Sequence, residues 1–193
     1  MSSTQTQRRG PGARAGKDHP TRQEIVEAAM ALADAQGLGS TSVEAVTRGA
    51  GHAKGTFYVH FDDRTELLVA LHDRFHDEVF QAIRDATSGL PAGVDRARTR
   101  IVAFLDACRR QPGVRAMLRD ARAVPEIAEL VRQRNAEAAA ELAADLTGST
   151  PWPKETASLL VVAVADAAVR EMEAGRRLPR LRSALLAMVH REE

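Results

Sequence analysis

Residues 41–61 read TSVEAVTRGAGHAKGTFYVHF, and their pattern is the most informative part of the sequence. It contains two short segments with helical patterning, 41–48 and 53–61, on either side of a glycine-rich break. Ala50 keeps the break small, and Gly51 can adopt the positive φ that a tight turn requires. Four apolar side chains supply an inner face: Val43, Val46, Phe57 and Phe61. The stretch therefore predicts two short helices packed on a longer first helix, a helix-turn-helix.

The outward face of the second segment carries side chains suited to duplex DNA. Lys54 can reach guanine O6 and N7, Gly55 lets the backbone come close, and Thr56 offers a methyl and a hydroxyl to base edges. We expect phosphate contacts from four further residues: Ser42, Tyr58, His60 and Arg64. Arg64 begins the next helix, where its charge adds to the exposed N–H groups of the helix N-terminus.

Helical periodicity continues along the rest of the chain. We expect helices over 21–36, from 63 to about 83, and over 94–110, 114–121, 125–146 and 154–174, with a last helix from Pro179. Thr41 and Glu44 match a capping box, with Ser42 as the alternative N-cap. Asp63 and Glu66 match a second one. No stretch shows the alternation of a strand, so we predict an all-α protein.

The composition of the chain limits the class of protein and its location. The 193 residues carry a net charge of +1, with 44% hydrophobic and 27% charged residues, as soluble globular proteins do. The single cysteine, Cys108, cannot form an intramolecular disulfide, so we expect a cytoplasmic location. No apolar run is long enough to span a bilayer, and the polar start does not look like a signal peptide. Residues 1–18 should form a disordered basic arm, which either touches an anionic polymer or is a solvated tail.

The motif from Ala50 to Phe61, followed by Arg64-Thr-Glu-Leu-Leu68, resembles the tetracycline-repressor (TetR) family, with Lys-Gly-Thr-Phe-Tyr-Val-His-Phe at its centre. The resemblance covers about residues 22–71. It implies a homodimeric transcriptional regulator, usually a repressor, that binds a palindromic DNA operator and responds to a small ligand. Ala53 departs from the family, which often has a serine there, and His52 replaces an apolar residue of the turn.

The resemblance also implies a division of the chain. Residues 19–66 would form the DNA-binding domain, with the motif at about 42–61, and residues 67–193 a helical effector-binding and dimerisation domain. Side chains that could line a pocket for a small hydrophobic or amphipathic effector are His72, Phe75, His76, Phe104, Cys108, Met117 and Met172. His72 and His76 have a spacing that can hold a metal, but we interpret them as pocket-lining or core-edge histidines and expect no metal or cofactor.

The last two helices have long apolar faces, which one protomer would have trouble covering. Residues 159–165 are apolar on every side, as in a helix buried between others. We therefore expect a four-helix dimer interface containing Leu159, Val162, Leu181, Leu185 and Met188. Trp152, between two prolines, is expected to pack on the bundle as a plug.

Two other classes of protein remain as alternatives. One is an all-α small-molecule-binding module without sequence-specific DNA function, and the other is a small helical enzyme. The sequence has no G-x-S-x-G, C-x-x-C, H-E-x-x-H or phosphate-binding glycine loop, so we expect no enzymatic activity.

Overall fold

The computed structural model describes residues 16, 18–36, 42–111 and 123–189. Across these ranges the chain is helical apart from turns and one isolated bridge between Thr147 and Thr150, which confirms the all-α prediction. The helices are α1 (Pro20–Gln36), α2 (Val43–Gly49), α3 (Lys54–His60), α4 (Arg64–Thr87), α5 (Val94–Arg110), α7 (Pro125–Leu146), α8 (Pro153–Ala174) and α9 (Pro179–Ala187). The helix expected over 114–121 and nearly all of the basic arm lie outside the described residues.

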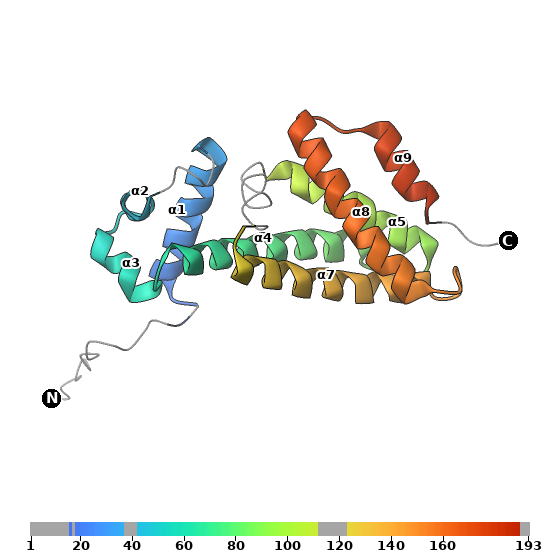
Figure 1. Ribbon diagram of the computed structural model, residues 1–193, viewed down its shortest axis with the longest axis horizontal. Coiled ribbons are helices and arrows are strands. Elements are labelled where there is room, and N and C mark those ends of the chain that lie inside the picture. Colours follow the sequence, from blue (N-terminus) through green and yellow to red (C-terminus); the bar gives the residue numbers. More distant parts are fainter. Residues whose placement is uncertain (1–15, 17, 37–41, 112–122, 190–193) are drawn as a thin grey trace.

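Helices α1, α2 and α3 form a separate unit at one end of the molecule (Figure 1). Of the four residues predicted for the inner face, Val46, Phe57 and Phe61 are at most 1% exposed, and Val43 is partly buried against the same core. The two phenylalanine rings stack with their centroids 5.1 Å apart. They share the core of this unit with fully buried Ile25 of α1, so the short helices are held by packing.

Local signals fix the ends of these short helices. Gly51 has a φ of 75°, as the tight turn requires. Ser42 is the N-cap of α2, and its hydroxyl oxygen accepts a hydrogen bond from the Ala45 N–H at 3.1 Å. Ala53 is the N-cap of α3 and offers no side-chain hydrogen bond there. Thr41, the other candidate cap, lies outside the described residues.

Helix α4 connects this unit to a bundle made with α5, α7 and α8, against which α9 packs (Figure 1). The Asp63 carboxylate caps α4 by accepting from the Glu66 N–H at 3.0 Å, as predicted. Glu66 in turn accepts from the Asp62 N–H at 2.7 Å. The first half of α4 packs on α1, and the second half packs on α5 and α7.

Two buried carboxylates tie the bundle together. Asp145 of α7 is fully buried and accepts from Arg96 at 2.5 Å and from Arg100 at 2.6 Å, both on α5. Glu171 of α8 is 1% exposed and accepts from Arg182 of α9 at 2.6 Å. Burial raises the pKa of Glu171, but the hydrogen bonds from Arg182 and the Leu178 N–H, together with the charges of Arg182 and Arg109, outweigh it, so the pKa is lowered. Both carboxylates are therefore paired with arginines of a neighbouring helix.

The structure corrects one expectation about the bundle surface. Trp152 is 66% exposed, so the prediction that it packs on the bundle as a plug was wrong. It directly precedes α8, between Pro151 and Pro153, and within the described residues most of its surface is left uncovered. None of the helices within the described ranges is both long and apolar enough to cross a membrane.

Candidate DNA-binding surface and ligand cavity

The outer side of α3 presents the residues expected to face DNA bases. Lys54 and Gly55 are exposed, and Thr56 is half-buried. A Cβ placed on Gly55 would meet no atom of the described residues within 4 Å, so none of these residues requires a glycine there. Val59 is 52% exposed one helical turn after Gly55, so an apolar group joins this surface. The sequence could have shown this position by its i, i+4 spacing from Gly55.

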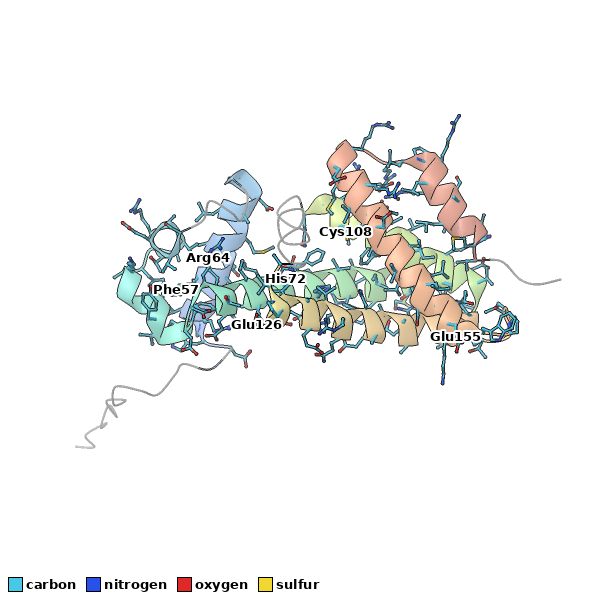
Figure 2. The ribbon with its side chains drawn as sticks, in the orientation of Figure 1. Phe57, Arg64, His72, Cys108, Glu126 and Glu155 are labelled. Atoms are coloured by element: carbon cyan, nitrogen blue, oxygen red, sulfur yellow. The ribbon has the colours of Figure 1, made fainter. Side chains whose placement is uncertain are left out.

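Of the expected phosphate contacts, three lie on the surface. Ser42 is the N-cap of α2, Tyr58 lies within α3 and Arg64 begins α4, and all three are exposed. Tyr58 is 56% exposed, and its ring meets Phe57 edge-on with a centroid distance of 5.3 Å, which orients the phenol outward. Figure 2 shows Phe57 directed into the unit and Arg64 at the start of α4.

His60 does not belong to that surface. It is 6% exposed because it follows Phe57 by three residues and therefore shares its inward face. Its ring lies 4.8 Å from the His19 ring. Burial lowers the pKa of His60, with nearby His19, Arg22 and His52 acting in the same direction. The assignment of His60 to a phosphate contact is therefore corrected: the ring is a neutral core group.

Two polar contacts brace the helix-turn-helix against α1. His52 Nε2 lies 2.7 Å from Glu24 Oε2, so this unusual turn residue is anchored to the first helix. The Arg22 guanidinium lies 4.5 Å from the centroid of the Phe61 ring and 3.6 Å from a Glu66 oxygen. These contacts hold α1, the turn and the start of α4 in one arrangement.

The bundle contains a cavity of about 120 Å³ between α4, α5, α7 and α8. Of the predicted pocket residues, four line it: Phe75, His76, Phe104 and Cys108. His72 and Met172 are not among its lining residues, and Met117 lies outside the described ranges. The Cys108 side chain is a thiol, because burial raises its pKa to about 12. His72 and Cys108 are labelled in Figure 2.

Sequence reasoning missed the charged part of this cavity wall. Arg100, Arg134 and Glu141 line the cavity together with the apolar residues. Their spacing within α5 and α7 resembles that of ordinary solvent-facing residues, and only the packing of the two helices brings them to the wall. Within the described ranges, no group of three His, Cys, Asp or Glu residues could hold a metal ion.

The predicted dimer residues divide into two sets. Leu159 and Val162 on α8 are 70% and 63% exposed, and Met188, just after α9, is 52% exposed. Leu181 is half-buried and Leu185 is only 4% exposed. Leu185 packs in the core of its own protomer, so its assignment to an intermolecular contact is corrected.

The N-terminal helices match a known protein family. Residues 25–71 match the family described as bacterial regulatory proteins, tetR family. The matched segment contains the helix-turn-helix, so residues 25–71 resemble the N-terminal domain of that family.

Solved structures agree with the TetR fold over most of the chain. A transcriptional regulator from Rhodococcus sp. Rha1 is similar with a TM-score of 0.74 and 23% identity, over 86% of this chain and 92% of that one. A TetR-family regulator from Shewanella sp. PV-4 has a TM-score of 0.69 and 24% identity, over 89% and 97%. The fatty acid degradation regulator FadR from Bacillus halodurans has a TM-score of 0.74 at 14% identity, over 91% and 100%. The fold thus extends beyond the matched domain, through the bundle that holds the cavity.

Proposed function

We propose that the protein is a homodimeric repressor that binds a palindromic operator and releases it when a small molecule occupies the bundle cavity. The observation that carries the proposal is the exposed side of α3: Lys54, Gly55 and Tyr58 lie on the surface, while Phe57 on the opposite side is buried. Lys54, Gly55 and Thr56 would read bases in the major groove. Ser42, Tyr58 and Arg64 would hold phosphates and set the register.

The exposed apolar face of α8 supports the dimer. Leu159 and Val162 lie about one turn apart on α8, and Met188, just after α9, is a further exposed apolar side chain. A second copy of the same surface would cover these side chains by twofold symmetry. A dimer would place two α3 helices about 34–36 Å apart, the spacing of successive major grooves, and the operator would then be a palindrome.

Helix α4 supports the link between ligand and DNA. Its first residues adjoin the helix-turn-helix, and five of its residues line the cavity: Phe75, His76, Val79, Phe80 and Ile83. From Arg64 to His76 the helix rises about 18 Å without an intervening joint. A ligand that shifts the cavity wall would therefore shift the DNA-binding unit. Coupling of about 1–3 kcal/mol would weaken operator binding roughly 5–150-fold.

Selection of bound duplexes from a random DNA pool, at a stated near-physiological salt concentration, tests the proposal. We expect enrichment of a palindrome whose half-sites lie one helical turn apart. Salt-sensitive binding without any enriched sequence would contradict sequence-specific regulation and favour a ligand-binding module that uses the helix-turn-helix as a scaffold. A single enriched half-site would contradict the dimeric part of the proposal.

A further inference from the structure

The cavity between α4, α5, α7 and α8 has the size of a single ring. Its volume is about 120 Å³, close to the ~150 Å³ of an engineered cavity that binds benzene. Three of the five phenylalanines of the chain line it, namely Phe75, Phe80 and Phe104. Aromatic side chains are scarce in this protein, at 4% of residues, so their concentration here favours a ring-shaped occupant.

The two cationic groups at the wall are already neutralised by acids of the protein. Arg100 donates to Asp145 at 2.6 Å and to Glu141 at 2.5 Å. Arg134 donates to Asp73 at 3.3 Å, Asp77 at 3.1 Å and Glu137 at 3.2 Å.

The surroundings of Arg134 are therefore acidic, since three carboxylates face one guanidinium. An anionic ligand would have to lose its hydration without gaining a cation that is not already paired. Burial of a charge without such compensation is strongly unfavourable. The charge pattern thus selects against carboxylates and phosphates and favours an uncharged occupant.

One polar atom at the wall has unused hydrogen-bonding capacity. His76 is 8% exposed and lines the cavity, and in the described part of the chain its Nε2 has no hydrogen-bond partner. The imidazole is neutral, because burial lowers the pKa of His76 to about 4, assisted by His72 and Arg134. A buried nitrogen of this kind is satisfied when a ligand brings a matching polar group.

We propose that this cavity binds a neutral phenol with a single ring, whose hydroxyl hydrogen-bonds to His76 Nε2. A hydroxyl both donates and accepts, so it can pair with Nε2 in either tautomer of the imidazole. The ring packs between Phe75, Phe80 and Phe104, while the paired arginines exclude anions. This inference rests on the proposed function, because it names the class of the effector that would release the operator.

The test uses three compounds with the same ring and different substituents: phenol, toluene and benzoate. Ligand-detected NMR titration of the full-length protein suits the weak affinities expected of such small molecules. We expect phenol to bind about fivefold more tightly than toluene, the ratio expected for one neutral hydrogen bond. Benzoate should bind at least about tenfold more weakly than phenol, because its charge is not compensated.

Two substitutions of histidine by leucine separate the role of the hydrogen bond from that of the cavity. His76→Leu should bring the phenol-to-toluene ratio to about one while toluene still binds, which also reports that the cavity is intact. His52→Leu, in the turn before α3, is the matched control and should leave the ratio unchanged. If His76→Leu fails to fold, Ala138→Leu, which narrows the cavity from α7, should weaken phenol and toluene together.

The outcomes are distinct. Toluene binding equal to phenol, or benzoate binding best, would overturn the assignment, and so would the absence of binding by all three. Operator release is measured separately by fluorescence anisotropy of a selected DNA duplex. Specific phenol binding without release would refute ligand-controlled repression but not the phenol site. Operator binding without any phenol binding would refute the site but leave the DNA function standing.

Discussion

Simultaneous replacement of Leu159 and Val162 by serine should dissociate the proposed dimer without unfolding the protomer. The two side chains are 70% and 63% exposed in the protomer, so a partner would bury most of each one. Complete burial of a leucine or valine side chain contributes about 1.5–3 kcal/mol. Because about two-thirds of each side chain is exposed in the protomer, its burial in a dimer would contribute ~1–2 kcal/mol to association. A twofold interface uses each residue twice, so the four side chains contribute about 4–8 kcal/mol.

That free energy corresponds to a rise of about 10³-fold or more in the dimer dissociation constant. Sedimentation equilibrium over the micromolar range measures it, and we expect a wild-type dimer and a monomeric variant. Circular dichroism should show unchanged helix content, since neither side chain is buried in the protomer. Leu90→Ser, at a 38% exposed position between α4 and α5, is the matched control and should stay dimeric. A double variant that remains as dimeric as the wild type would refute the assignment of this face.

Three further predictions concern DNA binding and pH. Lys54→Ala should relax preference at particular operator bases by about 1–3 kcal/mol, whereas Tyr58→Phe should weaken all operators about equally, as a panel of single-base operator variants would report. The ionised Glu171 side chain stabilises the folded state at pH values above the ordinary pKa of glutamate, and this stabilisation is lost as the pH falls through its lowered folded pKa. Glu171→Gln should therefore lower the free energy of unfolding at neutral pH. Urea unfolding should show that the free energies of the two proteins converge towards acid pH. Because burial lowers the pKa of His76 from 6.5 to about 4, protonation of the unfolded chain should reduce folding stability as the pH falls across that window, and urea unfolding of His76→Leu should show a flatter profile.

Features set by neighbouring residues could be predicted from the sequence. Gly51 adopts its positive φ and Asp63 caps α4, because both depend on a few adjacent residues. The spacing of Val46, Phe57 and Phe61 was sufficient to assign the core of the helix-turn-helix. Local patterning of this kind is a property of one helix or turn, and it survives whatever tertiary arrangement surrounds it.

Features set by packing between distant helices could not be predicted from the sequence. His60 is a different case: it was assigned to a phosphate contact, although its local three-residue spacing from Phe57 already indicated the inward face. Leu159 and Leu185 were both assigned to the dimer interface, yet Leu159 is exposed and Leu185 is buried in its own protomer, a difference that depends on how the helices pack. Arg96 pairs with Asp145 across 49 residues, a contact that no local pattern indicates.

The position of α4 is what would let the proposed ligand cavity act on the distant α3 surface. It is one 24-residue helix with neither glycine nor proline, capped at its start and packed in both the DNA-binding unit and the bundle. A bend is therefore costly, and a displaced cavity wall would tilt the whole helix. A tilt of about 5° about His76 would move the start of α4 by ~1.6 Å over the ~18 Å that separates them. In a symmetric dimer both helix-turn-helix units would move. The displacements from the two cavities would therefore both change the distance between the two α3 helices.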